Sequence, residues 1–381
     1  MKPNEIVEKL ASFPHRGVNT IYESQTLDFL TQLFDNQQVN KESFKTPKTY
    51  ISVVWWLICG LALGMVLVNY NAFAGLALTI LFVMMSFLYF NWYASPVTNF
   101  PPLVTSYNLV VKSPTEKPKA KLLLMAHWDS APVSLLYRPE MVGNFRKSLK
   151  MSLVLMMAAL FVAIVQFISP TPLFQWISYG LALYFIIQGI TGTIDFFRLG
   201  YSNGASDNAT GVAAAIETAQ QLWQMNLKNL EIELVLTGAE EVGMIGAKAY
   251  LKNHYKEFDK NTFLINFDTL GAGNLKIINK TGSWGDIVYD NDLVKIAKET
   301  VSQKSTLKSV STGAWHTADF DSVWFHRAGI PSVTLAALDQ NGRMPNIHRP
   351  TDTLKNVDFT PMNQAIELAV EIGKKLNLVK K

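Results

Sequence analysis

The sequence of 381 residues has little cysteine and little charge. Its single cysteine, Cys59, excludes an internal disulfide framework and a zinc site built on cysteine, so metal ligands would have to be His, Asp and Glu. Only 17% of the residues are charged and 49% are hydrophobic, which is too apolar for an ordinary soluble enzyme. The net charge of +4 is scattered without a basic block, so no nucleic-acid partner is expected. Residues 1–38 contain no apolar core segment, so we expect no cleaved secretory signal.

Charge is missing chiefly from four long apolar runs. Residues 50–70 and 72–93 form a first pair around Asn71, and residues 151–168 and 173–194 form a second pair around Pro170 and Pro172. Each run is long enough to cross about 30 Å of hydrocarbon as a helix that rises about 1.5 Å per residue. Buried core helices are the alternative, but the runs are not amphipathic. The sequence therefore predicts four membrane crossings as two hairpins, with a basic linker over residues 138–150 before the second.

Outside these runs, strand-like segments alternate with helical ones. Apolar spacing over residues 5–34 predicts two helices broken around Pro14 and Gly17, and a small-residue helix is expected over residues 212–224. Strands are expected near residues 39–44, 105–111, 121–125, 232–236, 263–267 and 330–336. This alternation predicts an α/β fold with a mixed, largely parallel sheet and helices on both faces.

The two hairpins would interrupt the sheet-containing domain without disrupting it, because an inserted hairpin brings its two ends close together. We therefore expect that domain in three pieces, residues 1–49, 95–150 and 195–381, and the hairpins at residues 50–94 and 151–194.

Metal-type side chains follow three of the expected strands: His127, the pair Glu240 and Glu241, and Asp268. The carboxyl ends of parallel strands meet at one edge of a sheet, where binding sites gather. Two adjacent carboxylates in a desolvated site need a cation; one can ligate it while the other takes a proton from water. Two solvated glutamates at a helix start are the simpler alternative for this stretch alone.

Two further residues complete a candidate ligand set. Asp207 opens the small-residue helix, and His348 lies in the loop after residues 330–336. Five His, Asp and Glu ligands without thiolates suit one or two zinc-like ions. A bridging carboxylate would allow a pair of ions about 3.5 to 4 Å apart.

The residues around these positions resemble peptidase family M28, the co-catalytic zinc exopeptidases. The matching motifs are Ala-His127-Trp-Asp129-Ser, Gly-Ala-Ser-Asp207-Asn-Ala-Thr-Gly, Glu240-Glu241, Asn-Phe-Asp268 and His348-Arg-Pro-Thr-Asp352-Thr-Leu. The resemblance implies two zinc ions per chain, with Asp207 bridging both. It implies that His127 and Asp268 complete one site and that Glu241 and His348 complete the other.

The resemblance also implies roles for residues beside the ligands. Glu240 would be the general base on a metal-bridging water, and Asp129 would orient the His127 ring through its second N–H. The Asp207–Asn208 bond matches a position that is often cis in the family. His316 would donate to the oxyanion or shape the substrate pocket, with a structural histidine as the alternative. Asp352 would position the loop of His348 rather than bind metal.

These features together predict a membrane-anchored di-zinc metallopeptidase, most simply an aminopeptidase, acting on a peptide substrate. The alternatives are a single-zinc glutaminyl cyclase-like acyltransferase and a catalytically inactive membrane scaffold. Metal stoichiometry and reaction product separate them. The aromatic residues Trp315, Phe320, Trp324 and Phe325 are expected to be core rather than a specificity pocket. Substrate side-chain preference, the peptide end recognised and the oligomeric state stay open.

Charge flanking the apolar runs predicts their orientation in a bilayer. The hairpin tips near Asn71 and Ser169 carry no lysine or arginine. The opposite ends are flanked by Lys41, Lys45, Lys48, Arg138, Arg146, Lys147, Lys150 and Arg198. Because positive flanks stay preferentially on the cytoplasmic side, we expect the N-terminus and the peptidase domain in the cytoplasm. The secreted or lumenal members of the resembled family would favour the opposite side.

Overall fold

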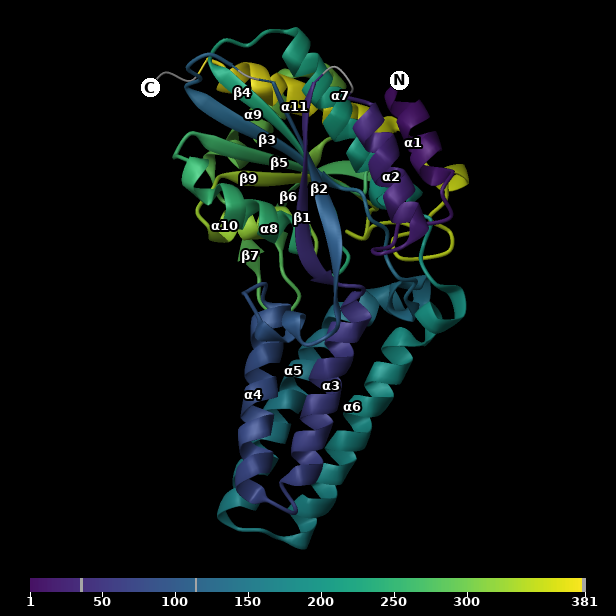
Figure 1. Ribbon diagram of the computed structural model, residues 1–381, viewed down its shortest axis with the longest axis vertical. Coiled ribbons are helices and arrows are strands. Elements are labelled where there is room, and N and C mark those ends of the chain that lie inside the picture. Colours follow the sequence, from purple (N-terminus) through teal and green to yellow (C-terminus); the bar gives the residue numbers. More distant parts are fainter. Residues whose placement is uncertain (35–36, 114, 379–381) are drawn as a thin grey trace.

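The computed structural model describes residues 1–34, 37–113 and 115–378. A sheet covered by helices forms one end of the molecule, and four long helices project from it (Figure 1). The first and last helices, α1 (Pro3–Ala11) and α11 (Thr360–Leu376), lie on the sheet-containing part, away from the four projecting helices.

The sheet has nine strands within the described residues, in the order β1-β2-β4-β3-β5-β9-β6-β7, with β8 paired to β6. The strands are β1 (Gln38–Pro47), β2 (Leu103–Ser113), β3 (Ala120–His127), β4 (Leu230–Thr237), β5 (Thr262–Asp268), β6 (Asn274–Thr281), β7 (Ile287–Val288), β8 (Ser311–Ala314) and β9 (Ser332–Leu338). The four central strands β4, β3, β5 and β9 are parallel, whereas β1, β2, β6 and β7 add antiparallel pairs at the edges. The predicted mixed α/β sheet is confirmed, with its parallel part at the centre.

Sequence patterns located the central strands to within two residues. The last predicted strand began at residue 330, but β9 begins at Ser332, directly after Pro331, which has no N–H for a ladder. Strands β6, β7 and β8 were not predicted. They are short or rich in polar residues, as in the four-residue β8, and so carry little apolar alternation.

Helices cover both faces of the sheet, as predicted. One face is covered by α1 (Pro3–Ala11), α2 (Ile21–Gln32), α7 (Gly211–Gln224), α9 (Asp292–Gln303) and α11 (Thr360–Leu376), and the other by α8 (Ile245–His254) and α10 (Ser322–Arg327). Short helical turns occupy η1 (Pro96–Asn99), η2 (Leu135–Tyr137), η3 (Ala205–Thr210), η4 (Tyr255–Glu257), η5 (Ser305–Leu307) and η6 (Leu354–Asn356).

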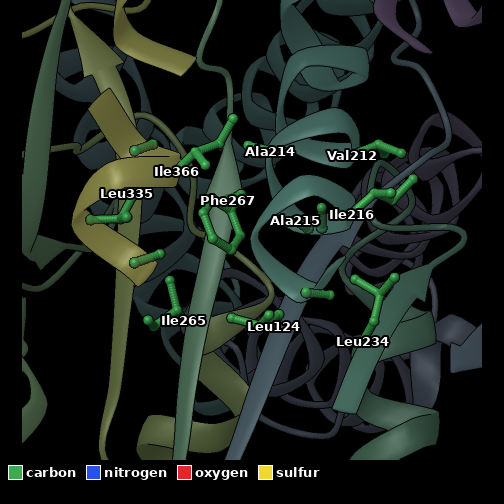
Figure 2. Close-up of a cluster of buried hydrophobic side chains, with 14 of the residues drawn as sticks. Leu124, Val212, Ala214, Ala215, Ile216, Leu234, Ile265, Phe267, Leu335 and Ile366 are labelled. Atoms are coloured by element: carbon green, nitrogen blue, oxygen red, sulfur yellow. The ribbon is translucent and has the colours of Figure 1, made fainter. Parts of the chain in front are cut away.

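The core follows from the two-residue period of the strands. On β3, Leu124 faces the cluster under α7, whereas Leu123 and Met125 face the cluster under α8. Figure 2 shows Ala215 of α7 above the strands, near Phe267 of β5. Alanines on α7 allow a close helix-to-sheet approach, which places the start of this helix against the ends of β3 and β5.

Within the described residues, four helices are long and apolar enough to cross a bilayer: α3 (Tyr50–Leu67), α4 (Ala72–Phe90), α5 (Pro139–Ile168) and α6 (Pro172–Leu199). They expose large apolar side chains such as Phe73, Phe161 and Trp176. The predicted linker over residues 138–150 is wrong, because α5 begins at Pro139. Proline at the first helical position is favourable, since its missing N–H would have no helical partner there.

The two hairpins pack against each other through small and polar residues. A Cβ on Gly189 of α6 would lie 2.7 Å from the Ile58 side chain of α3, so glycine permits this close approach. At the far end, Asn69 donates to Ser178 Oγ (2.7 Å) and accepts from Gln166 (2.8 Å). Polar groups away from water are thus paired across the hairpins.

The projecting helices are docked on the sheet-containing part. Trp284, in the turn between β6 and β7, is buried in the helix cluster, with its ring centroid 5.1 Å from that of Phe90. Arg138 pairs with Asp195 at 2.9 Å where α5 and α6 meet the domain. The second insertion is closed at its base, because Val133 N–H donates to the Gly200 carbonyl at 2.9 Å.

A buried arginine joins the N-terminal segment to two loops of the sheet edge. The Arg16 guanidinium donates to the carbonyls of Trp128 (2.7 Å), Asn203 (2.8 Å) and Gly204 (2.7 Å). Its backbone N–H donates to Ser130 Oγ at 2.9 Å. Burial lowers the pKa of Arg16 to about 10, so the side chain stays cationic at neutral pH.

Replacing Arg16 should therefore destabilise the protein. Arg16→Met removes the donors from several buried carbonyls, each of which costs about 1 to 3 kcal/mol when left unpaired. We expect a loss of at least about 3 kcal/mol and a clear fall in the melting midpoint in detergent. The matched variant Arg198→Met, at an exposed arginine, should melt like the wild type. Equal midpoints for the two variants would contradict this role of Arg16.

Candidate metal centre

The five predicted ligands meet at the carboxyl edge of the central strands. His127 and Asp268 are the last residues of β3 and β5, and Glu241 lies four residues after β4. Asp207 lies in the turn η3, directly before α7, and His348 lies in the loop after β9. These elements come from distant parts of the chain, and the parallel centre of the sheet brings their ends together.

The ligand atoms form two groups that share Asp207. His127 Nε2 lies 3.2 Å from Asp207 Oδ1 and 3.7 Å from Asp268 Oδ2. His348 Nε2 lies 3.3 Å from Asp207 Oδ2 and 3.1 Å from Glu241 Oε2. Within each group the ligand atoms lie within 4.8 Å of one another. The two groups are the same as the two metal sites that the sequence resemblance implies.

Glu240 lies beside the ligands. Its Oε2 is 3.9 Å from His127 Nε2, and a third group within 4.8 Å combines His127, Glu240 and Glu241. Glu240 and Glu241 are adjacent in a turn, and their side chains project in different directions. Glu241 reaches His348, whereas Glu240 faces His127. This is the separation of roles expected for a ligand and a neighbouring base.

Two buried carboxylates hold the turns that carry the ligands. Asp129 accepts the backbone N–H groups of Glu240 (3.0 Å) and Glu241 (3.1 Å). Asp352 accepts those of Ser206 (2.7 Å) and Asp207 (3.1 Å). Asp352, predicted to cap or position the loop that holds His348, thus joins that loop to the Asp207 turn, which presents two adjacent N–H groups.

Asp129 also approaches the imidazole that it was predicted to orient. Its carboxylate lies 3.6 Å from His127 Nδ1, and its backbone carbonyl lies 3.3 Å away. With Nδ1 facing these oxygens, Nε2 is directed at the ligand group. This is the orientation that a metal-binding imidazole requires.

The Asp207 turn is joined to the end of β5 by one side chain. Asn208 Nδ2 donates to the Phe267 carbonyl at 2.9 Å, and its Oδ1 accepts the N–H groups of Gly211 and Thr269 at 3.0 Å each. The Asp207–Asn208 peptide is cis, as the resemblance implies. The hydrogen bonds of Asn208 hold the Asp207 turn next to the end of β5, where Asp268 lies.

Unusual backbone conformations gather around the site. Ala239, Thr269 and His348 have positive φ angles of 53°, 48° and 53°. A left-handed conformation costs a residue with a Cβ about 1 to 2 kcal/mol. Such residues gather at functional sites, and here they lie beside Glu240 and Asp268 or are themselves a ligand.

The cluster contains more carboxylates than imidazoles, so negative charge is in excess. Burial favours a lower pKa for His127, but the carboxylates of Glu240 and Asp268 outweigh it and raise that pKa well above its usual value. Burial also opposes the charged form of His348, yet Glu241 and Asp207 raise its pKa to about 10. The carboxylates therefore stabilise positive charge at both imidazoles.

The donor set fits zinc. Asp207 Oδ2 and Glu241 Oε1 are buried and have no hydrogen-bond partner among the described residues, although unpaired buried carboxylate oxygens are costly. Imidazole nitrogens and carboxylate oxygens without thiolates are ordinary zinc ligands. A cation held by either of the two ligand groups would provide a partner for the unpaired oxygens and would offset the negative charge.

A cavity of about 250 Å³ opens at this cluster. Trp315 and Phe320 line it, so these two members of the predicted aromatic core also shape the site. His316 is absent from its described lining and instead lies 3.9 Å from Asp286, beside the β6–β7 turn. The structure thus brings the five ligands, Asp129 and Glu240 together, but not His316.

Sequence reasoning missed two tyrosines of this cavity. Tyr137 packs on His348 with ring centroids 4.3 Å apart, and Ser134 just before it donates to the His348 carbonyl at 3.1 Å. Tyr50, the first residue of α3, also lines the cavity. Tyr50 begins an apolar run predicted to span a membrane, and Tyr137 ends η2 just before α5, so no pattern in the sequence distinguished either tyrosine from an interfacial anchor.

Comparison with known sequences identifies the family. Residues 191–372 match the model of peptidase family M28. Aminopeptidase YwaD of Bacillus subtilis is 27% identical over 204 residues, which cover 50% of this chain and 43% of the relative. The probable lipoprotein aminopeptidase LpqL of Mycobacterium tuberculosis is 29% identical over 188 residues, covering 42% of this chain and 37% of the relative. The chain thus spans less than half the length of these relatives.

Solved structures share the fold. Glutaminyl cyclase of Porphyromonas gingivalis superposes with a TM-score of 0.58 at 14% identity, covering 98% of this chain and 97% of the other. A Zn-dependent exopeptidase of Parabacteroides distasonis gives 0.56 at 14% identity, covering 98% and 96%. At this identity the similarity establishes the fold alone. Taken with the sequence matches and the motifs, it places the chain in peptidase family M28, a family of zinc exopeptidases.

Proposed function

We propose that this protein is a membrane-anchored, two-zinc exopeptidase that acts as an aminopeptidase. The observation that carries the proposal is the pair of ligand groups sharing Asp207, with Glu240 beside them. His127, Asp207 and Asp268 would hold one ion, and Asp207, Glu241 and His348 would hold the other. Bound zinc supplies a Lewis acid that polarises the scissile carbonyl and makes water more acidic.

Side chains of the protein transfer the proton and position the catalytic groups. Glu240 takes the proton of the attacking water at its carboxylate and passes it to the leaving nitrogen. The water oxygen thereby joins the carbonyl carbon as the C–N bond breaks, which gives an acid and an amine. Asp129 keeps both glutamates in place through their backbone N–H groups, and Asp352 does the same for Asp207.

A glutaminyl cyclase-like activity is the second candidate, because such an enzyme shares the fold. The full set of ligands favours hydrolysis with two ions. In an inactive scaffold without metal, no cation would offset the free-energy cost of burying these carboxylates. Glu240 and the shared Asp207 therefore provide the two decisive tests.

Replacing Glu240 by glutamine should abolish most turnover without changing metal content. The amide keeps the size of the side chain but cannot accept a proton, and general-base catalysis contributes about 10² to 10⁴ in rate. We expect kcat to fall by about that factor on a peptide with a free amino terminus, measured by release of its first residue.

The same assay tests the polarity of the enzyme. The wild type should cleave the free peptide and leave its amino-acetylated counterpart intact. Cleavage of only the blocked peptide would exclude an aminopeptidase, and pyroglutamate formation from a glutaminyl peptide without hydrolysis would support the cyclase. Near-normal turnover in Glu240→Gln, or loss of its zinc, would remove Glu240 as the base.

Replacing Asp207 should lower metal content more than replacing a ligand of one site. Asp207→Ala should reduce occupancy of both positions, whereas His127→Ala should mainly empty one. Zinc per chain, measured by mass spectrometry after exhaustive dialysis, checks this. The surface variant Asp292→Ala should keep the wild-type ratio. Loss of one ion in both ligand variants would contradict the sharing of Asp207.

The membrane placement rests on the four apolar helices. The flanking charge favours a cytoplasmic domain, although Arg146 is paired with Asp286 and Arg138 with Asp195, so part of this charge also serves docking. Lys147, Lys150 and Arg198 are exposed or partly exposed at the same end and retain the bias.

A fusion after Lys381 tests the orientation. A reporter active only in the cytoplasm should give a strong signal there, and one active only outside the cytoplasm should be silent. Fusions at the hairpin tip, after Ser169, should show the opposite pattern. A silent cytoplasmic reporter with a strong external one at Lys381 would place the zinc site outside the cytoplasm.

A further inference from the structure

The cavity at the metal centre continues between the projecting helices. Its polar end is formed by the ligand cluster, including His127 and Glu241. Its other walls come from all four helices and include Leu57 of α3, Met156 of α5 and Phe185 of α6. One cavity therefore joins the reaction site to the interior of the helix bundle.

The helix walls form continuous apolar stripes. On α3 the lining runs from Tyr50 to Leu61 at helical spacing, which spans about 16 Å along the helix axis at about 1.5 Å per residue. On α5 it runs from Phe145 to Met156. The cavity thus extends well beyond the space that one amino-acid side chain next to the zinc ligands requires.

The polar side chains that α5 and α6 contribute to these walls are already hydrogen-bonded within the helix bundle. Gln188 donates to Ser152 Oγ, and Ser152 donates to the Ser148 carbonyl at 3.0 Å. Thr193 donates to the Gly189 carbonyl at 2.7 Å and accepts from the Trp55 indole at 3.3 Å. A peptide backbone placed here would lose its hydrogen bonds to water and find few partners. An apolar chain would lose nothing.

We propose that the substrate is an amphiphilic amide, a peptide or aminoacyl compound with a long apolar chain next to the scissile bond. The amide lies at the ligand cluster and the apolar chain lies between α3, α5 and α6. This inference rests on the proposed function and adds the substrate class to it. The helices are then a wall of the substrate site as well as an anchor.

Two glycines of α6 provide a matched pair of variants. A Cβ on Gly192 meets no atom of the described residues within 4 Å, and this glycine lines the cavity. The same holds for a Cβ on Gly180, but Gly180 is not among the described lining residues. Gly192→Leu should fill the cavity, whereas Gly180→Leu adds the same side chain to the same helix outside it.

The test measures kcat/KM in two substrate series with chains from ethyl to octyl. One series places the chain on the α-carbon of aminoacyl 4-nitroanilides, and the other places it on the leaving amine of leucine alkylamides. Burial of each methylene favours binding by up to about fourfold, and detergent reduces this gain. We expect the octyl compound of at least one series to exceed the ethyl compound by at least about tenfold. Gly192→Leu should abolish this preference, and Gly180→Leu should keep it.

A labelling experiment tests the same site without turnover. An octyl aminoacyl amide with a terminal diazirine is photolysed with Glu240→Gln protein, and the labelled peptides are mapped by mass spectrometry. Labels within α3 or α6 that Gly192→Leu removes support the proposal.

Each failure has a distinct meaning. If the wild type cleaves short amides with no dependence on chain length in either series, the substrate class is wrong and the peptidase assignment stands. Labels spread over the outer surface of the helices show that a bilayer lipid or nothing specific fills the cavity, which also overturns the proposal. If no amide is cleaved but the labels lie within the cavity, the proposed hydrolysis fails instead.

Discussion

The arrangement of this molecule depends on how negative charge is compensated at one buried sheet edge. Asp207, Glu240, Glu241 and Asp268 lie together there with the imidazoles of His127 and His348, and desolvation makes each unpaired charge expensive. Burial and repulsion from Asp207 raise the pKa of Glu241 to about 7. A bound metal cation would compensate this negative charge without protonation of the carboxylates. The carboxylates then remain available as ligands and base.

Side chains on turns are less precisely fixed than side chains on strands. Asp129 and Asp352 compensate for this difference at the candidate metal centre. His127 and Asp268 end their strands and need little help, whereas Glu241 and Asp207 lie on turns. Each of these turns is held by a carboxylate that accepts two successive backbone N–H groups, Asp129 in one case and Asp352 in the other. Charge-assisted bonds of this kind are among the stronger ones, so negative charge also provides the rigidity.

Residue patterns in the sequence predicted that the candidate ligands lie together, because each follows a short apolar strand or opens a helix, and parallel strands end at one edge. The hydrogen bonds of Asp352 could not be predicted, since they depend on which N–H groups a turn presents. The polar strand β6 and the four-residue β8 lacked a periodic signal. The cavity between the helices could not be predicted from the sequence either. Hydropathy shows that four helices are apolar, but not which faces meet, and the open side of Gly192 depends on that rotation.

Strand topology explains why helices and reaction site meet at all. Strand β1 is antiparallel to β2, and β2 is antiparallel to β4, so β1 runs in the same direction as β4 and β3. The first hairpin follows the carboxyl end of β1, and the second follows the carboxyl end of β3 at His127. Both insertions therefore leave the sheet at the edge that carries the ligands. A bilayer around these helices would lie against that edge, so a substrate would reach the metal centre at the membrane surface.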